Sequence, residues 1–162
     1  RDPLNFGGMV SYADKIVGRI AGKLDELGIR EKTLLIFLGD NGTHPVVTSQ
    51  FHGKPYEGGK GKQIQTGTHV PLIASWPQTI PAGRVNKDLV DSTDFFPTIC
   101  EAAGIRIPRN LPIDGQSFLP QLKGKTGKPR EWSYCWYAPR NNELRWEFAR
   151  DIEFKLYRDG TF

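Results

Sequence analysis

Apolar residues recur at helical spacing near the start of the chain and predict a long amphipathic helix. Between Phe6 and Leu27 they fall mostly three or four positions apart, with charged residues between them. Gly28 follows the last apolar position and suits the residue just beyond a helix end, where the backbone often turns left-handed. We expect one face of this helix to be packed, burying Met9, Ala13, Ile16, Val17, Ile20, Leu24 and Leu27.

Two short, continuous apolar runs predict buried strands. The first is TLLIFL at residues 33–38, and a run without alternation is typical of a strand covered on both faces in a parallel sheet. The second is VPLIASW at residues 70–76, with Pro71 tolerated only near its start or on an edge. Polar residues begin directly after the first run, at the carboxyl end of the strand, where ligands bind in open α/β sheets.

The second half of the chain predicts a short helix and then a small antiparallel meander. Residues 91–93 offer N-cap oxygens to a helix that runs to Ala103 and is closed by Gly104. Residues 105–131 are rich in Pro, Gly and charge, which indicates a segment that crosses between subdomains. Beyond it, aromatic-rich runs separated by turn residues predict strands at 132–137, 145–149 and 154–157.

Length and charge narrow the class of partner. A chain of 162 residues is long enough for one domain with a core, or for one domain and a fragment. Its net charge of +4 is modest and spread along the chain, which favours anionic ligands weakly and nucleic acid hardly at all. We also expect no membrane span. The opening RDPLNFGG has neither an initiator Met nor an apolar signal core, so we expect a piece of a longer chain.

About thirty polar and glycine-rich residues separate the two predicted strands, far more than the roughly 4–6 of an ordinary connection. At their start, Asp40 and Asn41 place a carboxylate and an amide oxygen side by side, followed by Gly42. Hard cations such as Ca²⁺ or Mg²⁺ prefer such oxygens, although other parts of the protein would have to complete the site. The alternative is an Asp-Asn-Gly turn chosen for its tolerance of positive φ, and the residues alone favour neither.

Lys60 is a second candidate binding residue in the same interruption. It lies in the stretch GGKG at residues 58–61, whose backbone N–H groups can converge on an anion while the ammonium acts as a point charge. A solvated loop lysine is the alternative. The spacing of His44, His52 and His69 fits no zinc template. We expect a structural hydrogen bond for His69 and exposure for the other two, with substrate contact as the alternative.

The cysteines and tryptophans are weaker candidates. Cys100 and Cys135 are too few for a disulfide scaffold and match no paired metal-ligand spacing. Cys135 begins CWYAPR, but the alternating aromatic residues indicate a packed strand, so we interpret this thiol as structural. The tryptophans Trp132, Trp136 and Trp146 could form a sugar-stacking platform, and packing between elements is the commoner alternative.

Five segments, in order along nearly the whole chain, resemble the type I sulfatases of the alkaline-phosphatase-like superfamily. The first is ADKIVGRIAGKLDELGIREKTLLIFLGDNG, which is similar to the family's helix and the strand that ends in Ser-Asp-Asn-Gly. The second is GGKGKQIQTGTHVPLIASWP, which resembles its Gly-Lys-Gly segment and Val-Pro-Leu-Ile strand. The others are DLVDSTDFFPTICEAAGI, IDGQSFLPQLKG and ARDIEFKLYRDG, which resemble the next strand and helix, the Asp-Gly-x-Ser-Leu segment and the C-terminal hairpin.

This resemblance implies roles for particular residues. It implies that Asp40 and Asn41 are two ligands of a single divalent cation, usually Ca²⁺ and otherwise Mg²⁺, and that Lys60 contacts the sulfate ester. The substrate would be a sulfated small molecule or glycan, with His52 as a further contact. The family's nucleophile is a formylglycine made from the Cys or Ser of C/S-x-P-x-R, and this chain has no such motif. We therefore expect the nucleophile in an N-terminal half that this chain needs, and expect the chain alone to be inactive.

Two further departures bear on subfamily and substrate. The family commonly shows Glu-Gly-Gly-x-Arg before its Val-Pro strand, whereas residues 65–69 here are Gln-Thr-Gly-Thr-His. Gly39 also replaces the usual Ser before the Asp-Asn pair. The implied fold is α/β: the C-terminal part of a mixed sheet flanked by helices at 1–120, then the start of a small antiparallel subdomain at 121–162. The implied location is extracytoplasmic, meaning periplasmic, secreted or lysosomal.

Three alternatives stay open from the sequence. A phosphodiesterase or phosphonate-type hydrolase shares the superfamily's scaffold and metal-ligand pattern. A non-catalytic module could bind anionic sugars through Lys60, His52 and the tryptophans, and a degenerate homologue could have lost its nucleophile. We also expect the interruption at residues 40–69 to be mobile in this chain, because two metal ligands do not offset its ordering entropy.

Overall fold

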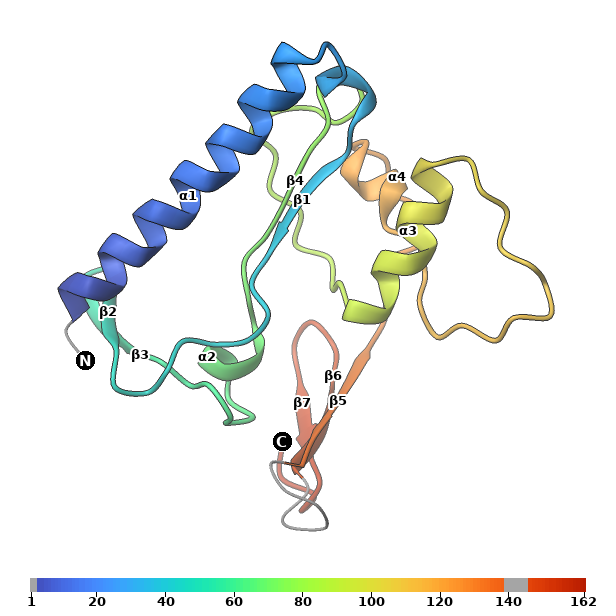
Figure 1. Ribbon diagram of the computed structural model, residues 1–162. Helices are drawn as coiled ribbons and strands as arrows, with labels where there is room; N and C mark the ends of the chain where they lie inside the picture. The colour runs from blue at the N-terminus through green and yellow to red at the C-terminus, as the bar shows by residue number, and fades with distance from the viewer. Residues whose placement is uncertain (1–2, 139–145) are drawn as a thin grey trace. The chain divides into compact units, whose positions relative to one another are not determined.

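The computed structural model describes residues 3–138 and 146–162, and the chain forms two compact units, Arg1–Trp76 and Pro77–Phe162. Figure 1 shows the elements of both in chain order. The boundary expected at residue 120 stays a prediction. In the first unit the elements are α1 (Pro3–Glu26), η1 (Arg30–Lys32), β1 (Leu35–Leu38), β2 (Thr48–Phe51), β3 (Lys54–Glu57), α2 (Gln65–Thr68) and β4 (Leu72–Ser75).

The long N-terminal helix is confirmed as α1, and so is its stop signal. Gly28 has φ 66° and donates its N–H to Asp25 O, while Ile29 N–H reaches back to Leu24 O, which satisfies the last carbonyls of the helix. The expected packing is wrong, because none of the seven apolar side chains is buried and Met9 is 63% exposed. No other element among the described residues packs over the apolar face of α1. Among them, no helix is long and apolar enough to cross a membrane.

The two apolar runs form strands β1 and β4, but they pair with each other in an antiparallel ladder, with Leu35 opposite Ser75 and Leu38 opposite Leu72. The parallel sheet covered on both faces is therefore wrong for the described residues. Phe37 and Leu38 are exposed, and Ile73 is 60% exposed. An unbroken apolar run reports that both faces are suited to burial, but it carries no information about the direction of the neighbouring strand.

In the second unit the helix and turn predictions are confirmed. The elements are η2 (Ser92–Asp94), α3 (Phe95–Ala102), α4 (Leu119–Leu122), β5 (Ser133–Tyr137), β6 (Trp146–Arg150) and β7 (Lys155–Tyr157). Asp91 caps η2 in a reciprocal capping box with Asp94. Gly104 closes α3 with φ 69°, and Ile105 N–H donates to Cys100 O.

The segment expected to cross between subdomains instead supplies the core of the second unit. Phe118 and Leu119 are 4% and 2% exposed, and the Phe118 ring meets Phe95 edge to face with centroids 5.6 Å apart. Thr98 is fully buried, and its hydroxyl accepts the Phe118 N–H at 3.1 Å while donating to Asp94 O at 2.7 Å. The Pro and Gly content of residues 105–131 led to the wrong expectation of a connecting segment. Phe118 and Leu119, which lie within it, supply the packing.

The small antiparallel meander is confirmed. Strands β5, β6 and β7 form a three-stranded sheet in that order, with Cys135 opposite Phe148 and Phe148 opposite Tyr157. Phe148 is 5% exposed, so one face of this sheet is packed around it. The predicted strand residue Arg145 lies outside the described residues.

Candidate functional site

Asp40 and Asn41 lie directly after β1, where the chain leaves the two-stranded ladder. Gly39 N–H still donates to Pro71 O at 3.0 Å, so the ladder fixes the residue before the pair. Both side chains are exposed, and Asn41 Nδ2 donates to Asp40 Oδ2 at 2.6 Å. Because the amide nitrogen is used in this bond, the Asn41 carbonyl oxygen and the second Asp40 oxygen are the atoms that can face a cation.

Four buried glycines organise the long interruption that follows, and we refer to Gly42, Gly58, Gly59 and Gly67 as the glycine junction. A Cβ at any of the four would fall within 3.0 Å of neighbouring atoms in the same junction, closer than real Cβ atoms come. Three stretches of backbone therefore cross at a spacing that only glycine permits. The structure therefore uses these glycines for close packing, a role that the sequence analysis did not predict.

Backbone hydrogen bonds join these three stretches. Gly42 N–H donates to Gly67 O at 3.0 Å, and Lys60 N–H donates to Thr43 O at 2.9 Å. Gly58 N–H donates to Val47 O at 3.0 Å, and Val47 is only 6% exposed. The second of these bonds ties Lys60 to a residue only two positions after Asn41, although Lys60 and Asn41 are nineteen positions apart in sequence. The base of the interruption is thus tied down, which argues against mobility there.

Lys60 itself is presented at a tight turn. Lys62 N–H donates to Gly59 O at 2.8 Å, and Gly61 supplies the positive φ of 81° that such a turn needs. The Lys60 side chain is exposed, and no carboxylate of the described residues pairs with it. Lys62, in contrast, lies 3.6 Å from Glu57. Of the two lysines at this turn, Lys60 is therefore the one whose ammonium is available to an external anion.

The three histidines do not gather at this site. His69 follows α2, and its Nδ1 lies 2.8 Å from Gln65 Nε2, so the structural hydrogen bond expected for it is confirmed. His44 accepts the Val46 N–H through Nδ1 at 3.2 Å and is exposed, as predicted. His52 is exposed at the tip of the β2–β3 hairpin. Among the described residues, no group of three or more His, Cys, Asp or Glu could hold a metal ion.

The surroundings of the two cysteines fit a structural role. Cys100 is buried in α3, and both thiols are free. Burial raises the pKa of the Cys135 thiol above its ordinary value, with Lys155 opposing this and Asp91 adding to it. A thiol held protonated in this way is a poor nucleophile, which agrees with the structural interpretation of Cys135.

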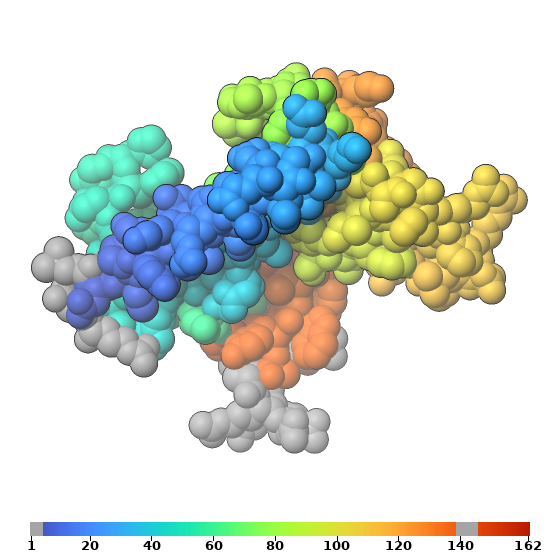
Figure 2. Space-filling view, turned by 45° about the horizontal axis from the view of Figure 1, so that its top comes forward, coloured from blue at the N-terminus to red at the C-terminus, as the bar shows by residue number. Residues whose placement is uncertain are grey.

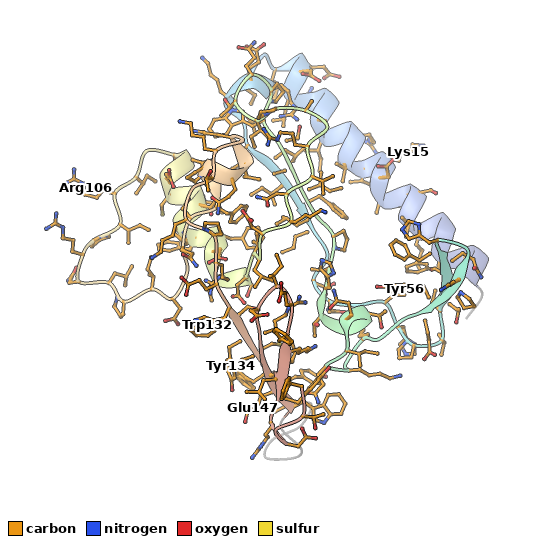
Figure 3. All side chains as sticks on the ribbon, turned by 180° about the vertical axis from the view of Figure 1, so that it is seen from behind. Lys15, Tyr56, Arg106, Trp132, Tyr134 and Glu147 are labelled. Atoms are coloured by element: carbon orange, nitrogen blue, oxygen red, sulfur yellow. The ribbon has the colours of Figure 1, made fainter. Side chains whose placement is uncertain are left out.

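The three tryptophans do not form one platform. Trp132 and Trp136 are each 59% exposed and alternate with Ser133 and Cys135 along β5, so with Tyr134 they share one face. Trp146 pairs with Tyr137, with ring centroids 6.2 Å apart, on the opposite face. Figure 3 shows Trp132 and Tyr134 along β5, with Glu147 on the next strand, where the Tyr134 hydroxyl donates to it at 2.5 Å.

Sequence reasoning missed one buried polar cluster, which lies in the second unit. Asp94 is 1% exposed, and its carboxylate accepts Arg130 Nε at 2.9 Å and also Arg130 Nη2. It further accepts the N–H groups of Asp91 and Gln116, each at 2.8 Å. Burial by itself would raise the pKa of Asp94, but the hydrogen bonds from Arg130 and the two N–H groups outweigh it and lower the pKa. No local pattern marks a pair 36 residues apart.

Comparison with protein families matches two descriptions. A model described as "Sulfatase" matches residues 2–105, and one described as "N-sulphoglucosamine sulphohydrolase, C-terminal" matches residues 62–158. The first match covers both Asp40 and Asn41 and the glycine junction. The two together cover the first four of the segments on which the resemblance to sulfatases was based, and the fifth as far as Arg158.

Individual relatives agree. Human steryl-sulfatase is 34% identical over 148 residues, which are 87% of this chain and 25% of that protein. The structure of Ps i-CgsB in complex with k-i-k-neocarrahexaose has a TM-score of 0.76 at 27% identity, covering 93% of this chain and 33% of that one. The structure of BT4656 in complex with its substrate D-glucosamine-2-N,6-O-disulfate has a TM-score of 0.69 at 25% identity, covering 91% and 29%. The chain spans about a quarter of the curated relative's length.

Proposed function

The chain belongs to the sulfatase family, and from this premise we propose that the whole protein of which it is a part hydrolyses sulfate esters. The observation that carries the proposal is the glycine junction, which ties the backbone of Lys60 to Thr43, two residues after the Asp40–Asn41 pair at the end of β1. An exposed ammonium without an ion-pair partner among the described residues suits an anionic ester, and a neighbouring pair of hard oxygen donors suits a divalent cation.

Lys60 would bind the sulfate group and neutralise part of its charge. Its ammonium can donate to a sulfate oxygen, and the turn at Gly59–Lys62 fixes the backbone from which the side chain extends. Negative charge shifts toward the leaving oxygen as a sulfate ester breaks, so an ammonium at that oxygen would stabilise the transition state more than it stabilises the substrate. Loss of one such group typically costs about 3–4 kcal/mol of transition-state stabilisation.

Asp40 and Asn41 fit a hard divalent cation, Ca²⁺ or Mg²⁺, as part of its ligand set. Their side chains are adjacent and exposed, and the hydrogen bond between them leaves one carboxylate oxygen and one amide oxygen for the ion. When bound, such an ion supplies Lewis-acid and electrostatic stabilisation of the ester oxygens. The described residues contain no group of three or more His, Cys, Asp or Glu that could hold a metal ion, so the remaining ligands would come from elsewhere in the whole protein.

The nucleophile would also lie elsewhere in the protein. Neither Cys100 nor Cys135 has a Pro two positions later, Cys100 is buried in a helix, and the Cys135 thiol has a raised pKa. We therefore propose a formylglycine in an N-terminal part of the whole protein, and propose that this chain alone does not turn over substrate. An extracytoplasmic location belongs to the same proposal.

The substrate class that we propose is a sulfated carbohydrate. Support comes from the match to the C-terminal region of N-sulphoglucosamine sulphohydrolase and from the two sugar-bound structures that resemble this chain. The sequence similarity to a steryl-sulfatase makes a sulfated sterol the alternative kind of substrate. The substrate panel of the test therefore includes both kinds.

The test uses the whole protein, co-expressed with a formylglycine-generating enzyme and assayed on aryl sulfate, aryl phosphate and a sulfated sugar. We expect sulfate turnover that falls at least about a hundredfold in both Asp40→Ala and Lys60→Ala. Lys62→Ala is the matched control, because it removes a neighbouring lysine whose salt bridge to Glu57 is solvent-exposed. A preference for phosphate would move the protein to the phosphodiesterase or phosphonate-type hydrolases. Absence of any turnover would favour a binding module.

A further inference from the structure

The β2–β3 hairpin projects from the glycine junction and has no packing layer of its own. All eight of its strand residues are exposed, and it is inserted between Asn41 and Lys60 in sequence. Its base is fixed by the bond from Gly58 N–H to Val47 O. Figure 2 shows the hairpin, in turquoise, as a separate projection of the surface. An isolated two-stranded hairpin is marginal in water, and no core among the described residues accounts for the aromatic side chains on this one.

One face of this hairpin carries two aromatic rings and a lysine. The strand register places Phe51 opposite Lys54 and Ser49 opposite Tyr56, so these four side chains share a face. The rings of Phe51 and Tyr56 contact each other, with centroids 5.4 Å apart, and are 58% and 41% exposed. Tyr56 is labelled in Figure 3. The opposite face, with Gln50 and Glu57, is polar.

The tip adds a third ring, and its backbone is unusual. His52 has φ 50° and Gly53 has φ 74°, the pair of left-handed residues that defines a two-residue turn of type I′. Asn, Asp or Gly is the ordinary choice for the first position, and His is among the residues that also accept a positive φ. The His52 ring packs edge to face on Phe51 with centroids 4.3 Å apart. The turn therefore places the His52 ring beside the aromatic face of the hairpin.

We propose that Phe51, Tyr56, His52 and Lys54 form a subsite for a sugar ring other than the one whose sulfate is cleaved. The aromatic rings would stack on the apolar face of a pyranose, and the Lys54 ammonium would pair with an anionic substituent of that sugar. This inference rests on the proposed function, because it assigns the protein to sulfated oligosaccharides or polysaccharides instead of sulfated monosaccharides or small aryl esters.

The length of the hairpin supports the same assignment. Four residues of extended strand span about 13 Å, so the tip lies at roughly that distance from the junction that carries Lys60. A small aryl sulfate bound at Lys60 does not reach that far. The subsite therefore separates long substrates from short ones, and its effect appears as a dependence of affinity on chain length.

The experiment measures binding to the whole protein by titration calorimetry, with the protein made without a formylglycine-generating enzyme so that no substrate is turned over during the titration. The probes are sulfated tetrasaccharides prepared from carrageenan and from heparin, each compared with its sulfated monosaccharide. We expect at least one tetrasaccharide to bind about tenfold more tightly than its monosaccharide, a factor that corresponds to roughly 1.4 kcal/mol. The double variant Phe51→Ser/Tyr56→Ser is expected to lose this preference. Lys54→Gln is expected to weaken binding of the tetrasaccharide and to make that binding less dependent on salt concentration.

The matched control is Gln50→Ala, which lies on the opposite face of the same hairpin and should bind like the unaltered chain. Circular dichroism confirms that each variant is folded, and exposed positions of a hairpin make misfolding of the rest unexpected. No length preference with either probe pair, or equal losses in Gln50→Ala and Phe51→Ser/Tyr56→Ser, would overturn the proposal. Failure of the proposed function shows separately, as absence of aryl sulfate turnover by the whole protein, and does not affect this binding measurement.

Discussion

Removal of the Asp94 carboxylate is expected to destabilise the second unit strongly. The carboxylate accepts four hydrogen bonds, and the side chains of Asp94 and Arg130 are only 2% and 10% exposed. In Asp94→Ala the guanidinium is left buried without its partner, and the N–H groups of Asp91 and Gln116 lose their acceptor. Breaking a buried pair from one side costs about 3–5 kcal/mol. That is a large part of the roughly 5–15 kcal/mol by which a whole domain is stable.

The assay is urea unfolding followed by tryptophan fluorescence, because Trp132, directly before β5, and Trp136, within it, are close in sequence to Arg130. Glu131→Ala is the matched control, since this exposed carboxylate neighbours Arg130 in sequence, and its removal should change the free energy of unfolding by less than about 0.5 kcal/mol. The double variant Asp94→Ala/Arg130→Ala should lose less than the sum of its single variants, by about 2 kcal/mol or more. A loss below about 1 kcal/mol in Asp94→Ala, at an unchanged urea slope, would refute this reasoning.

The same pair gives a pH dependence with a definite sign. Because the pKa of Asp94 is lowered in the folded protein, the stabilisation is fully present above the unfolded value of about 3.9. It is lost as the pH falls below that value and through the lowered pKa. Unfolding free energies between pH 6 and pH 2.5 should therefore converge for the unaltered chain and Asp94→Asn, and parallel curves would contradict the assignment.

Three further predictions concern the first unit and the free thiol. Gly58→Ala should cost about 1–3 kcal/mol in thermal unfolding, because the new methyl group meets the backbone of residues 43–44, whereas Gly18→Ala, in open space on α1, should not destabilise. In hydrogen exchange, the amides of Gly42 and Lys60 should be protected and those of the hairpin tip should not; fast exchange throughout would restore the mobility expected for the whole interruption. Cys135 should react with iodoacetamide at pH 7 more slowly than a free cysteine, and reaction at an equal rate would contradict its raised pKa.

The elements that the sequence predicted well are those whose cause is local. Helix α1, its end at Gly28, the capped start of α3 and the three C-terminal strands each follow from periodicity or from the φ preference of one residue. The pairing of β1 with β4 could not be found in this way, because strand direction depends on the path of the intervening chain. The sequence also could not predict that the apolar face of α1 is exposed. A periodic pattern shows which face of a helix suits burial but not which residues cover it.

The candidate site shows the same division more sharply. Asp40, Asn41 and Lys60 were found because their residue types and neighbours are informative, and the family match covers all three. Gly42 and Gly67 carried no comparable signal, because a glycine needed for close packing and a glycine needed for flexibility look identical in a single sequence. Only the Cβ positions distinguish them: Gly53 would meet nothing within 4 Å, whereas a Cβ at Gly67 would overlap the carbonyl oxygens of Lys62 and Gly59.

This distinction determines what the lysine can do. Were the interruption a flexible loop, Lys60 would sample many positions, and binding an anion would first have to remove that freedom at a cost of about 1–2 kcal/mol per ordered residue. With Gly58, Gly59 and Gly67 packed against their neighbours, most of that cost is met when the chain folds, so the affinity of an anion for the ammonium is not reduced by it. The glycines and Lys60 therefore act together in binding sulfate. Substitution of a junction glycine, although it touches no ligand, should weaken sulfate binding, as substitution of Lys60 should.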